Sequence, residues 1–380
     1  MGTCVFQIHY HNNETENNLN EESKPKNNKE YEISSHNIQI PSSQNEKIKK
    51  KLTSNSIIPG KFVSKNEFQF VVGEKIIEYI KSNKLDYQKY ISSIEHTYLQ
   101  EPYKFKNGNI YYGNWNKNCE MEGYGNYYVK TDNLISEGIW IKGNLIFGRL
   151  FFNNGDIYEG EIKKSFPNGK GKMFYQNGEK YEGNFENGEQ KGKGIFIFLD
   201  KTIYEGNFEN GIFNGEGKMK WKNGTEYIGN FIESSLSGKG EIVNIQKEKY
   251  VGDFKKNEFH GKGIYYDYKS REEYNGYFEC GLRKGKGIYK RKDGIIFDGE
   301  WDNDLPNGNG VIKNGNKKLK GFWRNGNYVE GNEISDKTFD NLNKNIFPFK
   351  INIYPSSLPH LEGNDVNTSQ ISSVKELDFF

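Results

Sequence analysis

The sequence predicts an all-β protein: an elongated, single-layer antiparallel β-meander, with a helical segment before it and disordered termini. Three observations support this fold class. An aromatic-led motif returns about every 23 residues, each copy carries a later Gly-x-Gly pair, and Asn-Gly or Asp-Gly dipeptides separate many of the copies. A fixed period of this kind indicates stacked supersecondary units rather than one closed core.

The repeat is clearest in two consecutive copies. Tyr181-Glu182-Gly183-Asn184-Phe185 returns 23 residues later as Tyr204-Glu205-Gly206-Asn207-Phe208. The leading positions of the series are Tyr158, Tyr181, Tyr204, Tyr227, Tyr250, Tyr274, Phe297 and Leu319. A longer copy begins at Tyr111, and a degenerate copy surrounds Trp140.

The composition limits the class of protein. The chain of 380 residues contains 43 Gly, 26 Tyr and 26 Phe, so aromatic rings must supply most of the packing. Its 53 basic and 51 acidic residues nearly cancel, which argues against a nucleic-acid partner. The cysteines Cys4, Cys119 and Cys280 are scattered, which fits a reducing compartment. No apolar run is long enough to span a bilayer.

Residues 1–56 are predicted to be a disordered N-terminal tether. Most of this segment is rich in Asn, Glu, Lys and Ser, a composition that cannot offset the entropy lost on ordering. The chain starts with Met-Gly-Thr-Cys, which places Gly2 where myristate is added and Cys4 where palmitate can join it. Phe6 departs from the usual myristoylation pattern, which has Ser or Thr there. An unmodified tail is therefore the alternative interpretation.

Residues 57–100 are predicted to be helical. Apolar residues recur at three- and four-residue steps, first at Val72, Ile76, Ile77 and Ile80 and then at Tyr87, Tyr90, Ile91, Ile94 and Tyr98. Because Ser82-Asn83-Lys84 separates the two runs, we expect two helices or one bent helix. The apolar face needs a partner, and the sheet that follows is the nearest one.

Residues 101–331 are predicted to form the meander. Tyr158, Gly160 and Ile162 alternate with charged residues, which predicts a strand. The dipeptides predict two-residue type I′ turns at Asn154-Gly155, Asn177-Gly178, Asn223-Gly224 and Asp293-Gly294. The alternation puts the aromatic residues and the paired glycines on one face, where rings can cover the glycines.

Residues 332–380 are predicted to be a capping segment followed by a disordered tail. Phe339, Ile346, Phe347 and Phe349 are suited to cover the open edge of the last strand. Residues 356–380 have the composition of a disordered segment.

The Tyr-x-Gly-x-Phe opening with its later Gly-x-Gly, at 23-residue spacing, resembles the MORN (membrane occupation and recognition nexus) repeat. The resemblance covers residues 111 to about 331. It implies the β-meander and a scaffolding role, often where membranes meet cytoskeleton or organelles. It implies no single activity, because the repeat occurs both in stand-alone scaffolds and beside lipid-kinase or methyltransferase domains. Some members are associated with phosphoinositides.

No group of residues predicts catalysis, a cofactor or a metal site. Glu159, Glu182 and Glu205 recur with the repeat, so we interpret them as a solvated stripe that pairs with lysines of adjacent strands. The histidines are dispersed, and no nucleophile with a matching base can be recognised from spacing. We therefore expect no enzyme activity.

The densest group of basic residues is a candidate patch for a membrane or an acidic partner. It consists of Arg283, Lys284, Lys286, Lys290, Arg291 and Lys292. The alternative interpretation is a solvated face.

The middle copies carry apolar residues at positions that are charged or polar in other copies. These residues form a candidate partner-binding face: Ile228, Ile232, Val243, Val251, Ile264, Tyr266, Tyr277 and Ile288. A single-layer sheet must cover so many apolar groups. Our hypothesis is that they seat a helix, either the chain's own segment 67–99 or one from a protein partner.

Taken together, these patterns predict a non-enzymatic scaffold or adaptor that binds proteins on the cytoplasmic side of a membrane, or at the associated cytoskeleton, through N-terminal acylation. Open strand edges also allow a homo-oligomer. One alternative is a phosphoinositide- or phospholipid-binding module, and another is a regulatory subunit of an enzyme complex. The tethered scaffold depends on Gly2 and Cys4, whereas the lipid-binding module depends on the basic patch.

Overall fold

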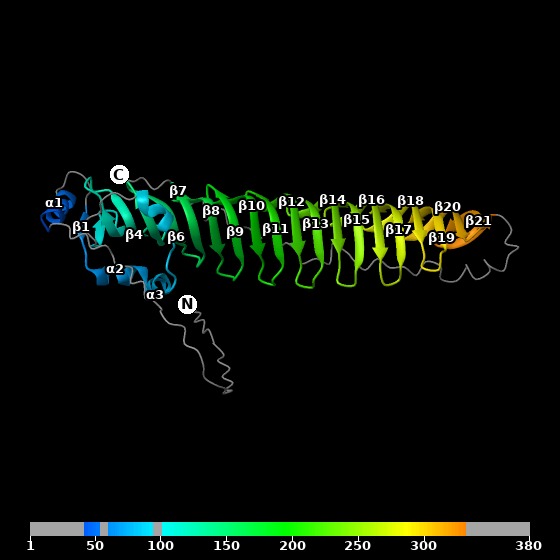
Figure 1. Cartoon of the computed structure of the whole chain (residues 1–380), viewed down its shortest axis with the longest axis horizontal. Coiled ribbons are helices and arrows are strands. Elements are labelled where there is room, and N and C mark those ends of the chain that lie inside the picture. Colours follow the sequence, from blue (N-terminus) through cyan, green and yellow to red (C-terminus); the bar gives the residue numbers. More distant parts are fainter. Residues whose placement is uncertain (1–41, 54–59, 94–100, 332–380) are drawn as a thin grey trace, which may run out of the picture. The chain divides into compact units, whose positions relative to one another are not determined.

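The computed structural model describes residues 42–53, 60–93 and 101–331, and its main feature is an open antiparallel sheet of 22 strands (Figure 1). Each strand pairs with the next strand along the chain, so the predicted meander is confirmed. The strands are β1 Gly60–Phe62, β2 Tyr103–Phe105, β3 Ile110–Trp115, β4 Met121–Val129, β5 Leu134–Ile141, β6 Asn144–Phe151, β7 Ile157–Lys163, β8 Phe166–Phe174, β9 Lys180–Glu186, β10 Glu189–Ile197, β11 Ile203–Glu209, β12 Ile212–Lys220, β13 Glu226–Ile232, β14 Ser235–Val243, β15 Glu248–Lys255, β16 Glu258–Asp267, β17 Glu272–Glu279, β18 Leu282–Lys290, β19 Ile296–Asp302, β20 Leu305–Asn314, β21 Lys317–Arg324 and β22 Asn327–Gly331.

Within the described residues, the helical elements all precede β2 in the chain. They are α1 Ser42–Thr53, α2 Lys65–Val72, α3 Glu74–Ser82 and the 3-10 helix η1 Gln88–Ser93. Among the residues that the structure describes, no helix has the length and apolar character needed to cross a membrane.

Two kinds of turn alternate along the meander. Asn187 and Gly188 join β9 to β10, and their φ angles of 50° and 94° are both positive, as a type I′ turn requires. The prediction of type I′ turns is wrong for the four dipeptides that it named, because only the glycine of each has a positive φ: Asn154-Gly155, Asn177-Gly178, Asn223-Gly224 and Asp293-Gly294. At Asn177-Gly178, the Gly178 amide donates to the Tyr175 carbonyl (2.9 Å) and Gly178 has a φ of 93°. This arrangement is typical of a three-residue loop with a bulged glycine.

Each leading aromatic ring covers two glycines. A Cβ atom added at Gly206 or at Gly217 would lie 2.6 Å from a ring carbon of Tyr204, so the predicted ring-over-glycine packing is confirmed there. The first glycine of each Gly-x-Gly pair is different, which corrects the prediction. Gly215 lies in a β-bulge with a φ of 92°, beside the Asn207 side chain and not beneath a ring. A left-handed backbone explains the glycine at that position.

The bulge also explains why the covering ring is usually a tyrosine. A bulge leaves a carbonyl on the facing strand without its ladder partner. The Tyr204 hydroxyl donates to the Asn207 carbonyl (2.8 Å), and the Tyr181 hydroxyl donates to the Asn184 carbonyl (2.9 Å). Burial raises the pKa of both tyrosines, so their hydroxyl groups remain donors.

Rings of neighbouring units contact each other in a repeated geometry. Tyr181 meets Phe208 of the next unit edge to face, with ring centroids 4.8 Å apart, and Tyr204 meets Phe231 at 5.0 Å. The same contact joins Tyr158 to Phe185, Tyr227 to Phe254, Tyr250 to Phe278, Tyr274 to Trp301 and Phe297 to Trp323. The core is therefore a row of aromatic rings in which each unit packs on the one that follows.

The helices α2 and α3 pack on the open face of the first strands, meaning the face opposite the row of rings. Phe68 and Val72 of α2 are buried with Ile110, Ile135 and Phe151 of β3, β5 and β6. The expectation that the sheet would be the partner of these helices is confirmed for its first strands.

A buried ion cluster fixes the end of α3. The Arg149 guanidinium donates to Glu159 (2.7 Å), to Glu137 (3.2 Å) and to the carbonyl of Asn83, the residue that follows α3. The Tyr124 hydroxyl donates to Glu137 (2.6 Å). The Arg149 and Glu137 side chains are only 4% and 2% exposed, so this cluster is shielded from solvent.

Two predictions about the first hundred residues need correction. Composition predicts disorder up to residue 56, yet α1 is formed: Leu52 is buried, and its carbonyl accepts a hydrogen bond from the Tyr103 hydroxyl (2.9 Å). A contact distant in sequence therefore orders a segment that its own composition does not. In the predicted helical segment, β1 pairs with β2, and Gly73 divides α2 from α3. The second apolar run forms only η1 in the described part.

Several predicted features lie outside the described residues and stay predictions. They are the acylation candidates Gly2 and Cys4, the helical positions Ile94 and Tyr98, and the capping residues Phe339, Ile346, Phe347 and Phe349.

Candidate binding groove

A groove crosses the open face of β9–β18. Its floor is a column of glycines, because each strand places one glycine opposite a glycine of the next strand. These are Gly183, Gly194, Gly206, Gly217, Gly229, Gly240, Gly252, Gly263, Gly276 and Gly287. Side chains alternate along a strand, so the residues before and after each glycine point to the open face and form two walls.

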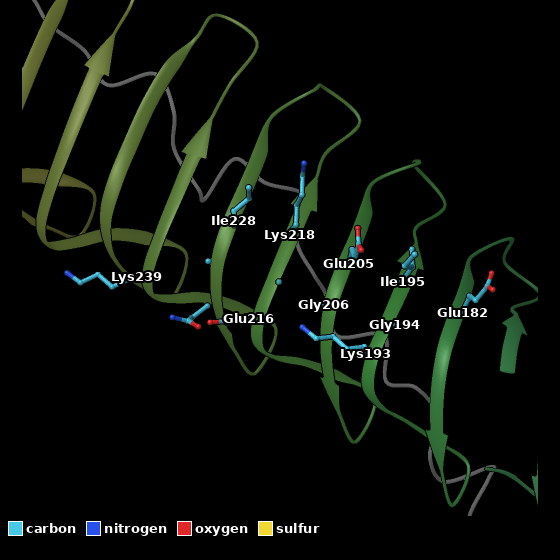
Figure 2. A pocket seen from close by; sticks show the side chains of 13 residues that line it. Glu182, Lys193, Gly194, Ile195, Glu205, Gly206, Glu216, Lys218, Ile228 and Lys239 are labelled. Atoms are coloured by element: carbon cyan, nitrogen blue, oxygen red, sulfur yellow. The ribbon is translucent and has the colours of Figure 1, made fainter. Parts of the chain in front are cut away.

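The two walls differ in composition. The first wall consists of Glu182, Ile195, Glu205, Lys218, Ile228, Glu241, Val251, Ile264, Asn275 and Ile288, each in register with the next. The second wall consists of Lys193, Asn207, Glu216, Asn230, Lys239, Asp253, Lys262, Tyr277 and Lys286. Figure 2 shows the first part of both walls, with Gly194 and Gly206 between them.

The groove is continuous over much of its course. One hollow of about 970 Å³ begins at Glu182 and ends at Lys239. A second hollow of about 510 Å³ shares Ile228 and Lys239 with the first and extends to Asn275.

Half of the predicted partner-binding residues lie in the first wall. Ile228, Val251, Ile264 and Ile288 are 56%, 41%, 43% and 37% exposed, and Val251 is directly opposite Ile264. Tyr277 belongs to the second wall.

The other three predicted residues lie beyond the walls. Val243 and Tyr266 lie two residues beyond the first wall on β14 and β16, at its outer side. Ile232 pairs with Ser235 beside a hairpin turn, away from the groove.

Ile195 was not among the predicted residues; it is 40% exposed and belongs to the first wall on β10. It directly follows the second glycine of its Gly-x-Gly pair. At that position other copies have Lys172, Lys218, Ile264 and Ile288. A comparison of the copies position by position would have found it.

Some of the charged side chains in the walls form ion pairs with each other or with side chains beside the walls. Lys239 contacts Asp253 (2.6 Å), and Lys249 contacts Glu241 (2.8 Å). Hydrogen bonds from Lys218 and Lys220 lower the pKa of Glu226. Of the predicted stripe, Glu159 contacts Arg149 (2.7 Å) rather than a lysine, and Glu182 contacts Lys172 of the adjacent strand (3.4 Å), so the predicted pairing is confirmed at Glu182. Exposed pairs of this kind contribute little stability, about 0–1 kcal/mol each.

The predicted basic patch is mostly neutralised. Lys284 pairs with Glu279, Lys290 with Glu273 (2.9 Å) and Arg291 with Asp293. Of the two remaining lysines, Lys286 belongs to the second wall of the groove and Lys292 is exposed beside a turn.

Arg283 does not belong to any surface patch. It is 1% exposed, contacts Asp304 (3.0 Å) and lies over the Trp301 ring at 4.7 Å. It occupies the core position that Phe213 and Phe259 hold in other units.

The hypothesis that the chain's own helical segment covers the middle copies is wrong for the described helices. They pack against Ile110, Ile135 and Phe151, near the start of the sheet. The groove over β9–β18 therefore lies beyond the strands that these helices cover.

Comparison with known families identifies the repeat. Six stretches match the MORN repeat: residues 158–180, 181–202, 204–226, 250–269, 274–296 and 297–317. The chain carries multiple MORN repeats across residues 158–317. The intervening unit does not match, although Tyr227 covers Gly229 and Gly240 in the same way. This unit also holds Ile228, the most exposed apolar side chain of the groove.

Solved structures offer a weak likeness. The TCP10 domain of Danio rerio CPAP, in complex with a peptide of Danio rerio STIL, is 10% identical, covers 53% of this chain and 88% of its own, and has a TM-score of 0.33. The TCP domain of Drosophila melanogaster SAS-4, in complex with a proline-rich motif of Ana2, is 15% identical, covers 41% and 85%, and has a TM-score of 0.27. A likeness at this level says nothing about what this chain binds. No curated protein matches the sequence.

Proposed function

We propose that this MORN-repeat protein is a non-enzymatic scaffold that binds a protein segment in the groove over β9–β18. The single observation that carries the proposal is the exposed apolar series in the first wall, above a floor of bare glycine backbone. Exposed apolar side chains that line a hollow beside polar groups are typical of a ligand site. Several wall charges form ion pairs, Lys239 with Asp253 in the second wall and Glu241 and Lys218 with Lys249 and Glu226 beside the first, which supports binding rather than chemistry.

The energetics favour a protein ligand. The apolar residues Ile195, Ile228, Val251, Ile264 and Ile288 keep between 37% and 56% of their surface exposed. Complete burial of such a side chain contributes about 1.5–3 kcal/mol, so covering the remaining part of each gives roughly 1 kcal/mol. Five such residues supply roughly 5 kcal/mol in total, which offsets part of the cost of ordering a ligand in the groove.

The groove test replaces two wall residues with charged ones. We expect Val251→Asp with Ile264→Asp to abolish recovery of bound proteins in proximity labelling of the intact protein, because an extended apolar surface becomes anionic. Ile203→Asp is the matched control, since Ile203 is 39% exposed on the same face but outside the groove. Both variants should keep their thermal stability. Equal recovery from the groove variant and the parent would contradict the proposed function.

The membrane tether is a separate part of the proposal. Myristate on Gly2 and palmitate on Cys4 would together anchor the scaffold, because one acyl chain alone gives only marginal binding. We expect Gly2→Ala with Cys4→Ser to move the protein from the membrane fraction to the soluble fraction, whereas Thr3→Ala has no effect. Cell fractionation measures this directly. An unchanged distribution of the double variant would exclude acylation as the anchor.

A further inference from the structure

A short segment near the C-terminus has a pattern that fits the groove. The chain continues for 49 residues after Gly331, and it reads Ile-Phe-Pro-Phe-Lys-Ile-Asn-Ile-Tyr over residues 346–354. Phe347, Phe349, Ile351 and Ile353 alternate with Pro348, Lys350 and Asn352. This period of two predicts an extended segment with one apolar side.

Pro348 restricts the simplest use of that segment, which is to pair with the open edge of β22, because the proline nitrogen would have to face solvent there. Proline has no backbone N–H and removes a bond from the middle of a strand ladder. A segment that binds mainly through its side chains tolerates the proline. An extended chain lying across the strands, in a groove, binds in this way.

The groove has the width for an extended chain. Its walls are formed by the residues on either side of each glycine, so they are roughly 7 Å apart along the strand direction. An α-helix with its side chains is about 10–12 Å in diameter and would rest on the walls rather than between them. The spacing of the walls thus favours an extended segment over a helix.

The spacing of apolar residues also agrees. In the first wall they lie on β18, β16, β15 and β13, at Ile288, Ile264, Val251 and Ile228. These positions span five strand spacings, or roughly 24 Å, while Phe347 to Ile353 spans roughly 20 Å when extended.

Residues 332–346, which connect Gly331 to the segment, are numerous enough to reach the groove. From β22 back to β18 is four strand spacings, or roughly 19 Å, and the 15 residues 332–346 reach up to about 50 Å. A chain that turns back from Gly331 meets Ile288 first. Because the segment belongs to the same molecule, its effective concentration at the groove is of the order of millimolar.

We propose that residues 347–354 occupy the groove over β13–β18, with Phe347, Phe349, Ile351 and Ile353 against the first wall. A protein partner must then displace this internal segment. The inference rests on the proposed function in that it concerns the same groove, and it adds how access to the groove is controlled.

The test measures how well the groove is covered in the full-length chain. Val251→Cys is introduced together with Cys4→Ser and Cys280→Ser, and the rate of its reaction with a maleimide is recorded; the remaining cysteine, Cys119, is buried. We expect Phe349→Asp with Ile351→Asp to raise the rate about tenfold, as happens when a segment docked nine-tenths of the time is released. Lys350→Asp with Asn352→Asp is the matched control and is expected to leave the rate unchanged, because these residues belong to the polar half of the alternating pattern.

Equal rates in the parent and in the Phe349→Asp, Ile351→Asp variant would overturn the inference. Protection that increases with protein concentration would also overturn it, since a second copy would then be the occupant. As a second measurement, Val251→Cys with Ile351→Cys should form a disulfide within one chain under mild oxidation, and Val251→Cys with Asn352→Cys should not.

The outcome is distinguishable from failure of the proposed function. If the groove is covered but Val251→Asp with Ile264→Asp leaves protein recovery unchanged, the segment docks and the scaffold proposal is wrong. If recovery falls while the maleimide rates are equal, the groove binds partners without internal control.

Discussion

Replacing Tyr204 by alanine is expected to destabilise the middle of the sheet by about 3–5 kcal/mol, as removal of a large buried aromatic side chain does. Tyr204 is fully buried and stacks on Phe213 with ring centroids 3.9 Å apart. It also meets Phe208 and Phe231 edge to face. Its loss uncovers Gly206 and Gly217, and these glycines have no side chain with which to fill the cavity.

The effect should be local, because each unit packs chiefly on its neighbours. Native-state hydrogen exchange therefore measures it best, and we expect faster exchange in β11–β14 than in β19–β21. Tyr204→Phe is the matched control and should cost only about 1 kcal/mol, for the hydroxyl bond to Asn207. The chain already holds a phenylalanine at this position in another unit, where Phe297 covers Gly299 and Gly310. Similar exchange in the Ala and Phe variants would contradict the role assigned to the ring.

Arg149→Met is expected to cost about 3–5 kcal/mol, since it leaves a buried carboxylate without its partner. Glu137 would keep only the Tyr124 hydroxyl, and the carbonyl of Asn83 at the end of α3 would lose its donor. We therefore expect α2 and α3 to detach before the sheet unfolds. Fluorescence or circular dichroism during urea denaturation should show an additional early transition.

Two comparisons make this prediction specific. Lys172→Met removes the next positive charge along the same open-face row, where Lys172 pairs with Glu182 at 3.4 Å in an exposed position, and should change stability by less than about 1 kcal/mol. Glu137→Gln combined with Arg149→Met removes the stranded charge and should recover part of the loss. If Arg149→Met lost no more stability than Lys172→Met, the cluster would not hold the helices.

The Arg149→Met variant should also respond to pH. Burial raises the pKa of Glu137, while Tyr124 and Arg149 oppose that shift. A carboxyl group whose pKa rises on folding binds its proton more tightly in the folded state, so its contribution to stability falls as pH rises through its folded pKa. Without Arg149 the pKa of Glu137 should rise further, because the guanidinium no longer stabilises the carboxylate. The stability deficit of the variant should therefore be smaller at about pH 5 than at about pH 7.

Much of the fold could be predicted because the repeat itself carries the physical constraints. The tyrosine, the glycines and the turn dipeptides recur at one spacing. A copy that departs from the pattern can therefore be interpreted by comparison with the regular copies. The turn type could not be predicted in this way, since Asn-Gly serves both a two-residue turn and a three-residue loop with a bulged glycine. Order in α1 was missed because it depends on Leu52 meeting Tyr103, a contact that local composition does not encode.

The groove was only partly predictable, for a different reason. Apolar substitutions at Ile228, Val251, Ile264 and Ile288 were visible in the sequence, but their alignment in one wall depends on strand register. The bulge at the first glycine of each pair shifts that register, so the rows can be traced only once the bulges are known. Charge patterning was a poorer guide, because Arg283 resembles a surface residue in the sequence and is buried beside Trp301.

The aromatic contact between consecutive units has a consequence for how such a chain changes in evolution. Because the ring of each unit meets the same kind of ring in the following unit, as Tyr204 meets Phe231 and Tyr227 meets Phe254, the joints are interchangeable. Removing or duplicating one 23-residue copy, such as 204–226, would leave every remaining joint chemically intact. Each such event would alter the sheet by two strands, or roughly 10 Å. The length of the sheet can thus change by whole units while the aromatic contacts of the core stay the same.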